Sequence, residues 1–102
     1  MSPLPNAQPA SPPIRVRVTF SGRVQGVGFR ATVRDRAEAV PGITGWVRNE
    51  PDGTVLAEIQ GERAKVDDLL DGIHSDRARH ITGSDVARIE VVPGEAGFAI
   101  VR

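Results

Sequence analysis

The chain has 102 residues, 13 basic and 13 acidic side chains, a formal net charge of +0 and no cysteine. This length corresponds to one domain, and the balanced charge argues against a general binder of nucleic acid or of membrane surfaces. The lack of cysteine excludes disulfides, thiolate metal sites and cysteine nucleophiles. No apolar run approaches the roughly 20 residues of a membrane-spanning helix, and no secretory signal is visible. We therefore expect a cytoplasmic protein.

Residues 1–13 differ in composition from the rest of the chain. They contain five prolines and no charged residue. Such a segment cannot bury enough apolar surface to offset its ordering entropy. We expect a disordered Pro-rich tail over residues 1–13 and a domain over residues 14–102.

The domain begins with patterns typical of a strand and a helix. Apolar and polar residues alternate over residues 14–21, which predicts a half-buried strand. After a glycine-rich turn, apolar residues recur about every four positions from Phe29 to Val40, which predicts an amphipathic helix. Pro41-Gly42 is expected to end this helix.

The middle of the chain predicts a hairpin and a second helix. Residues 44–49 and 55–59 are predicted as strands on either side of a turn signal, Pro51-Asp52-Gly53. Apolar residues spaced i, i+3, i+4 and i+7 over residues 66–73 predict the helix.

The last part of the chain has weaker signals. We expect a polar loop over residues 74–85, a third alternating strand over residues 87–91 and a short edge strand over residues 98–100. The order β-α-β-β-α-β with one extra strand belongs to the α+β class. It predicts a ferredoxin-like α/β sandwich, with two helices on one face of a four- to five-stranded antiparallel sheet.

Several functions that this fold supports are disfavoured by composition. RNA-binding versions stack bases on sheet aromatics, and this chain has three Phe, one Trp and no Tyr. His74 and His80 are six residues apart in a polar segment and are expected to be solvated, so no metal site is predicted. Twelve of the 13 basic residues are arginine, which indicates a compositional bias. Each arginine therefore indicates function only through its position.

The turn between the first strand and the first helix is the strongest functional signal. Its sequence over residues 22–30 is Gly-Arg-Val-Gln-Gly-Val-Gly-Phe-Arg. Glycine permits positive φ angles, so several backbone N–H groups can point at one spot, where the helix N-terminus adds positive potential. Arg30 is electrostatically unfavourable there unless an anion lies beside it. The simplest ligand is an anion the size of phosphate.

Asn49 is a second candidate. If Val47 faces the helices, Asn49 faces the same way at the end of its strand, and its amide could lie near the glycine turn. Asparagine is also common at strand ends before a turn, so a purely structural role stays open at this point.

Three motifs in the chain resemble those of the acylphosphatase family: residues 22–30, Gly45-Trp-Val-Arg-Asn49 and Pro51-Asp-Gly-Thr-Val55. The resemblance spans about residues 16–100. It implies the sandwich fold and hydrolysis of the carboxyl–phosphate bond of acyl phosphates without a metal or another cofactor. It implies that Arg30 is the phosphate-binding catalytic arginine and that Asn49 positions the attacking water. The implied phosphate site consists of Gly22, Arg23, Val24, Gln25, Gly26, Val27, Gly28 and Arg30.

The implied partners are a small-molecule acyl phosphate and inorganic phosphate. We expect a monomer that binds neither nucleic acid nor membranes. Two alternatives remain. One is a non-catalytic module that binds an acyl phosphate or carbamoyl phosphate, like the domain that opens larger hydrogenase-maturation proteins. The other is a structural or regulatory domain in which Arg30 caps a loop.

The chain departs from the family pattern in three places. Residues 40–43 include about one extra residue, which predicts a looser helix end. Ala31 and Thr32 follow Arg30 where an aromatic residue is common, which opens the rim of the site. The segment over residues 74–85 is longer and more basic than usual; its Arg77, Arg79 and His80 are either solvated or steer anions. Arg23 is expected to point outward with a modest steering role.

Overall fold

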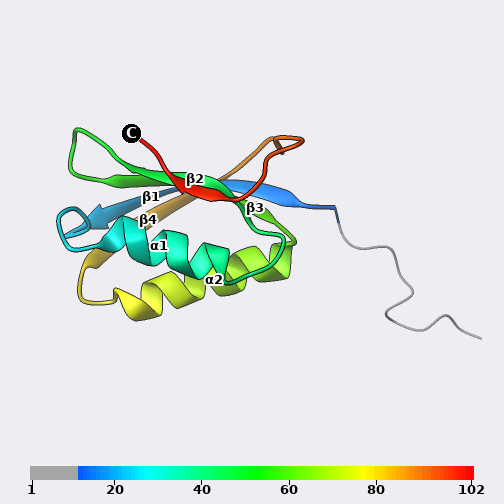
Figure 1. Cartoon of the computed structure of the whole chain (residues 1–102). Helices are drawn as coiled ribbons and strands as arrows, with labels where there is room; N and C mark the ends of the chain where they lie inside the picture. Colours follow the sequence, from blue (N-terminus) through cyan, green and yellow to red (C-terminus); the bar gives the residue numbers. More distant parts are fainter. Residues whose placement is uncertain (1–11) are drawn as a thin grey trace, which may run out of the picture.

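The computed structural model describes residues 12–102, with two helices on one face of a sheet (Figure 1). The elements in chain order are β1 (Ile14–Gly22), α1 (Phe29–Glu38), β2 (Thr44–Asn49), β3 (Val55–Gly61), α2 (Arg63–Asp76), β4 (Ile81–Ile89) and β5 (Phe98–Ile100). Residues 1–11, and with them most of the predicted tail, lie outside the described part of the chain.

The strands are arranged in the order β4-β1-β3-β2-β5. Neighbouring strands are antiparallel, except that β5 runs parallel to β2 with Ile100 opposite Val47. The ferredoxin-like sandwich is therefore confirmed, but the prediction of an entirely antiparallel sheet is wrong at this edge. The reason is topological: the chain reverses direction after β4 and crosses to the far edge, where β2 already runs in that direction.

The core lies between the sheet and the two helices. Its main side chains are Val16, Val18 and Phe20 of β1, Phe29, Val33 and Ala37 of α1, and Val66, Leu69 and Ile73 of α2. Burying each larger aliphatic or aromatic side chain contributes about 1.5–3 kcal/mol. Helix α1 ends at Glu38, two residues before the predicted Val40, whose N–H donates to the Ala37 carbonyl in a tighter turn at 3.1 Å.

The segment after α2 differs from its prediction. Helix α2 continues to Asp76 and β4 begins at Ile81, so only residues 77–80 form a turn where a loop over residues 74–85 was expected. Val86 lies opposite Val18 on the helix side of the sheet, yet it is 52% exposed because β4 is an edge strand. The strand predicted over residues 87–91 is therefore found, but it begins at Ile81 and ends at Ile89. An edge strand does not need an apolar face, so the polar residues 82–85 gave no strand pattern.

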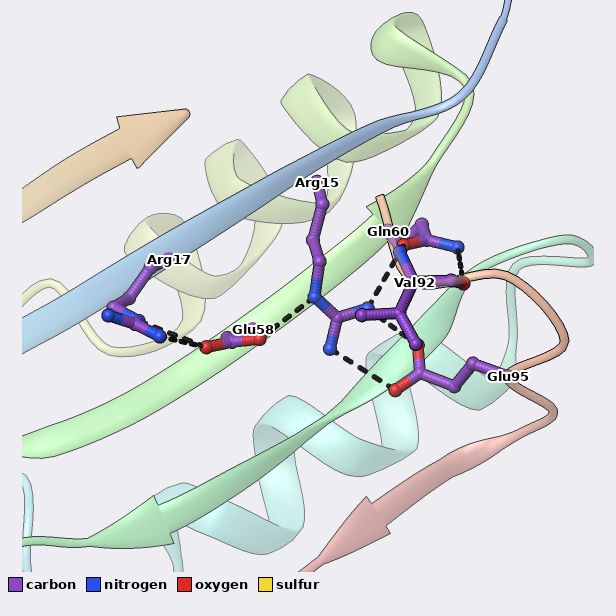
Figure 2. A network of polar contacts seen from close by, with 6 residues as sticks. All are labelled: Arg15, Arg17, Glu58, Gln60, Val92 and Glu95. Carbon is purple, nitrogen blue, oxygen red and sulfur yellow. Dashed lines mark hydrogen bonds and ion pairs between the residues drawn. The ribbon is translucent and has the colours of Figure 1, made fainter. Parts of the chain in front are cut away.

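Residues 90–97 connect β4 to β5 and form the crossing segment. A charged network fixes this segment to the face of the sheet opposite the helices (Figure 2). Arg15 Nε donates to Glu58 Oε1 at 2.8 Å, and its two terminal nitrogens donate to the carboxylate oxygens of Glu95 at 2.8 and 3.2 Å. Gln60 bonds the backbone N–H and carbonyl of Val92 at 2.8 and 3.0 Å. Arg15 is only 1% exposed. The segment between β4 and β5 thus covers this arginine, and its side-chain bonds help to place β5.

The ion pairs of this network shift the pKa values of its carboxyl groups. The hydrogen bond from Arg15 lowers the pKa of Glu95, against a smaller opposing effect of burial. Burial raises the pKa of Glu58, but hydrogen bonds from Arg17 and Arg15 together outweigh it, and the pKa is lowered overall. Both carboxylates are therefore ionised at neutral pH, where the network has its full strength.

Candidate active site

The turn between β1 and α1 depends on glycine for its backbone course. Gly22, Gly26 and Gly28 have φ angles of +117°, +76° and +76°, in the region that disfavours other residues. At Gly22 there is also no room, because a Cβ atom would lie 2.2 Å from the carbonyl oxygen of His80. Gly28 is the N-cap of α1 and has no side chain to accept from the first helical amides. The N-terminus of α1 is thus left without a side-chain cap.

A hollow of about 180 Å³ opens at this helix end. Its lining residues come from the turn, the first turn of α1 and the last strand: Val24, Gly26, Gly28, Phe29, Arg30, Ala31 and Ile100. Pockets for drug-sized ligands are larger, about 300–1,000 Å³. The dimensions of this hollow suit a small group such as a phosphoryl group.

Backbone amides at the start of α1 are available as donors to a ligand in the hollow. The Gly28 carbonyl accepts the first bond of the α1 ladder, from Thr32 N–H at 3.1 Å. The N–H groups of residues 29–31 come before that bond, so they have no acceptor within the helix. All three of these residues line the hollow. Unpaired amides at a helix N-terminus, with the partial positive charge of the helix dipole, favour an anion.

Arg30 adds a full positive charge to the same hollow. Six other arginines form ion pairs, namely Arg15, Arg17, Arg34, Arg36, Arg48 and Arg63. Within residues 12–102, no carboxylate lies within 4.0 Å of the Arg30 guanidinium nitrogens. An internal carboxylate therefore does not occupy this guanidinium, which is free to meet an external anion.

The structure brings only part of the predicted phosphate site to the hollow. Val24, Gly26, Gly28 and Arg30 line it, and the other four residues do not. The N–H of Arg23 donates to the His80 carbonyl at 2.8 Å, and its side chain is exposed, as expected.

Gly22 lies against the same carbonyl of His80, and Val27 packs on the core. Gln25 is turned toward the β2–β3 hairpin, where its Nε2 donates to the carbonyls of Glu50 and Thr54 at 2.7 and 2.8 Å. These residues shape the turn from outside the hollow.

The contacts of Gln25 tie the glycine turn to the end of β2, where Asn49 lies. Asn49 lies two positions after the fully buried Val47 in β2. Asn49 pairs with Val55 in the β2–β3 ladder. Its Oδ1 atom is buried and has no hydrogen-bond partner among residues 12–102. Buried polar atoms are nearly always paired, so an unpaired acceptor is a candidate for a water or a ligand. Asn49 does not itself line the hollow.

Three lining residues were not predicted as site residues. Phe29 was assigned to the core, and Ala31 was noted only as a departure at the rim. Their adjacency to Arg30 in the first helical turn was the available signal, since the free amides of a helix always include its first residues. Ile100 had no such signal, because it reaches the hollow only through the parallel pairing of β5 with β2.

The described residues contain no group of three or more His, Asp or Glu side chains that could hold a metal ion. Over the same part of the chain, neither helix has the length and apolar character needed to cross a membrane. The fold and the hollow together define a ferredoxin-like domain with a phosphate-sized cradle at its first strand–helix turn.

Comparisons with known proteins place this domain in a family. A family profile described as Acylphosphatase matches residues 16–100. An acylphosphatase of Trichormus variabilis is 40% identical over 99 residues, which cover 97% of each chain. One from Rubrobacter xylanophilus is 45% identical over 87 residues, covering 84% of this chain and 78% of the relative. The chain belongs to the acylphosphatase family.

Solved structures agree with this assignment. The crystal structure of acylphosphatase from Bacillus subtilis superposes with a TM-score of 0.77 at 28% identity, over 87% of this chain and 99% of that one. An acylphosphatase from Coxiella burnetii gives a TM-score of 0.76 at 32% identity, over 87% and 93% of the two chains. The family predicted from the three motifs is therefore confirmed, and with it an enzyme of the hydrolase class.

Proposed function

We propose that the chain hydrolyses the carboxyl–phosphate bond of acyl phosphates, giving a carboxylate and inorganic phosphate, and that the hollow at the start of α1 is the site of this reaction. The observation that carries the proposal is the unpaired guanidinium of Arg30 beside the uncapped helix N-terminus. Two sources of positive potential converge there, and no carboxylate of residues 12–102 lies within 4.0 Å of the Arg30 guanidinium nitrogens. A dianionic phosphoryl group complements both sources.

Arg30 and the amides of residues 29–31 hold the phosphoryl oxygens. Phosphoryl transfer needs mainly positioning and neutralisation of charge, which these donors supply. The leaving group is a carboxylate whose conjugate acid has a pKa of about 4–5, so it departs as a stable anion. No general acid is required, which agrees with a hollow lined by neither histidine nor carboxylate.

Asn49 positions the attacking water. Among residues 12–102 its buried Oδ1 is an acceptor without a partner. Because Asn49 does not line the hollow, its side chain has to turn toward the hollow before a water can donate one hydrogen to Oδ1 while the water oxygen faces phosphorus. The water oxygen bonds to phosphorus as the bond from phosphorus to the acyl oxygen breaks. The electron pair of that bond leaves on the carboxylate, and the water proton passes to the phosphate product or to solvent. The nucleophile is thus a positioned water without a strong protein base.

The reaction is proposed to need no metal and no other cofactor. The partners are then a small-molecule acyl phosphate and inorganic phosphate, the protein acts as a monomer, and its location is cytoplasmic. The non-catalytic binding module considered above has no support from the relatives, which carry the name of the enzyme at 40–45% identity.

An assay with benzoyl phosphate in the presence of a chelator tests the proposal. Wild-type protein is expected to turn the substrate over equally with and without chelator. Arg30→Ala is expected to lower turnover by at least about 10²–10³-fold while the circular dichroism spectrum is kept. Arg34→Ala is the matched control, because Arg34 lies one turn further along α1 and pairs with Asp35. Phosphate binding by the wild type without any turnover would instead support the non-catalytic module.

A further inference from the structure

Arg77 is a second guanidinium beside the proposed phosphate cradle. Helices α1 and α2 run side by side in opposite directions, so the end of α2 lies next to the start of α1 (Figure 1). Arg77 follows the last residue of α2. Its Nη2 donates to Thr32 Oγ1 at 2.6 Å and lies 3.4 Å from the Gly28 carbonyl oxygen. One side chain from the second helix thus reaches the N-cap of the first.

Thr32 links this arginine to the Gly28 carbonyl. Its hydroxyl accepts from Arg77 and donates to the Gly28 oxygen at 3.2 Å, and its own N–H donates to the same oxygen at 3.1 Å. Three donors therefore converge on one carbonyl at the start of α1. An ordinary N-cap carbonyl receives only the single ladder bond.

The orientation of this carbonyl determines the direction of a cradle donor. The peptide unit is planar, so the N–H of Phe29 points opposite to the Gly28 carbonyl. When the carbonyl is held along the helix, the N–H is held toward the hollow that Phe29 lines. Gly28 has a left-handed backbone (φ +76°) and no Cβ, so its own conformational preference restrains this peptide weakly. The restraint from Arg77 and Thr32 therefore matters more here than at an ordinary N-cap.

The charge of Arg77 is also available to the cradle. Among residues 12–102, no carboxylate oxygen lies within 4.0 Å of its guanidinium nitrogens. Its neighbour Asp76 is held instead by Arg36, whose Nη2 donates to Asp76 Oδ1 at 2.8 Å. Arg77 is favourably placed at the C-terminus of α2, but a cation near the N-terminus of α1 is unfavourable unless an anion is bound nearby. An occupied cradle would relieve this cost for Arg77 as it does for Arg30.

We propose that Arg77 is a positioning residue of the phosphate cradle, which acts through Thr32 and the Gly28 carbonyl to orient the amide donors of the first turn of α1. This inference rests on the proposed function. It also separates residues that the sequence analysis treated alike in the segment over residues 74–85, as either solvated or steering anions: Arg77 donates a hydrogen bond to Thr32, whereas Arg79 is exposed.

Four variants test the role of Arg77. Arg77→Ala removes the guanidinium, and Arg77→Lys keeps the charge without the planar donor geometry. Thr32→Val removes the linking hydroxyl and leaves the charge in place. Arg79→Ala is the matched control in the same turn. The measurements are KM and kcat for benzoyl phosphate, the inhibition constant of inorganic phosphate, and the amide chemical shifts of residues 28–31 during a phosphate titration.

Arg77→Ala is expected to raise KM and the phosphate inhibition constant together by about 3- to 10-fold, the effect of one charge-assisted hydrogen bond, with a smaller change in kcat. Thr32→Val is expected to reproduce part of this loss, Arg77→Lys to restore part of it, and the double variant Arg77→Ala with Thr32→Val to lose less than the sum. The Phe29 amide is expected to shift less on phosphate addition in both single variants.

Equal phosphate constants for Arg77→Ala and Arg79→Ala would overturn the inference. If Arg77→Ala does not fold, the same comparison is made with Thr32→Val, and a wild-type phosphate constant there overturns it equally. Wild-type protein that binds phosphate but does not turn over benzoyl phosphate would contradict the proposed function alone, because the titration still reads the role of Arg77. Wild-type protein that binds no phosphate contradicts both.

Discussion

Arg15 and Glu95 are 80 residues apart in the sequence, and the guanidinium of one forms two hydrogen bonds, of 2.8 and 3.2 Å, to the carboxylate of the other. The pair lies on the face of the sheet opposite the helices and joins β1 to the segment that leads into β5 (Figure 2). Ile100 of β5 lines the hollow at the start of α1. Because the Arg15–Glu95 pair holds the segment that leads into β5, it links the face of the sheet opposite the helices with the site.

Arg15→Ala is expected to lower the free energy of unfolding by about 2–4 kcal/mol, because it leaves two partly buried carboxylates short of a partner. Arg17→Ala is the control: Arg17 also bonds Glu58, but its side chain is 52% exposed, and we expect a loss below about 1 kcal/mol. Urea unfolding of the two variants measures the difference. Equal losses would mean that burial of the Arg15 guanidinium adds nothing to its ion pairs.

The same network is expected to make stability depend on pH in the acid range. The pKa values of Glu58 and Glu95 are lowered in the folded state from an ordinary value of 4.5. Their contribution is therefore fully present above about pH 4.5 and is lost as the pH falls through the lowered values, where protonation breaks the pairs. Glu95→Gln is expected to be less stable at neutral pH and to lose less on acidification. Urea midpoints measured from about pH 7 to pH 3 test this; parallel curves for the two proteins would contradict it.

Gly26→Ala and Gly22→Ala are a matched pair of variants for measuring how the glycine turn affects the free energy of unfolding. Gly26→Ala meets no atom within 4 Å, so its cost is that of a left-handed alanine, about 1–2 kcal/mol. Gly22→Ala carries a similar backbone cost and also places its Cβ 2.2 Å from the His80 carbonyl, which forces the β1–β4 pairing to shift. We expect a loss of at least about 3 kcal/mol. Thermal unfolding of both variants is the measurement, and a smaller loss at Gly22 than at Gly26 would contradict the account of this close approach.

The sequence predicted the parts of the fold and site that depend on local physics. Alternation in β1 and helical spacing in α1 and α2 follow directly from burial of one face. The positive φ angles of Gly26 and Gly28, and the free amides beside Arg30, follow from the glycine spacing and the start of a helix. These features need no knowledge of distant residues, so they can be recognised in a single chain.

The parts that were missed depend on contacts between distant residues. Arg15 was counted as compositional bias, because nothing near it in the sequence shows that Glu95 covers it. The direction of β5 and the place of Ile100 in the hollow depend on the crossing segment that this pair holds. Arg77 was placed in a polar loop, either solvated or steering anions, and only the antiparallel packing of α1 and α2 brings it to Thr32.

Asn49→Ala is expected to separate catalysis from anion binding. Because the buried Oδ1 has no hydrogen-bond partner in the described part of the chain, its removal leaves no partner there unsatisfied, and the free energy of unfolding should change by less than about 1 kcal/mol. Turnover of benzoyl phosphate should fall by about 10- to 1,000-fold, since the water loses its acceptor, while the inhibition constant of inorganic phosphate stays within about 2-fold of wild type.

Arg30→Ala provides the opposite pattern for comparison with Asn49→Ala, because it should lose phosphate affinity and turnover together. Both constants are measured on each variant under the same conditions. If Asn49→Ala lost phosphate affinity as strongly as turnover, Asn49 would belong to the anion cradle. The division of labour between a guanidinium that holds the phosphoryl group and an amide that holds the water would then be wrong.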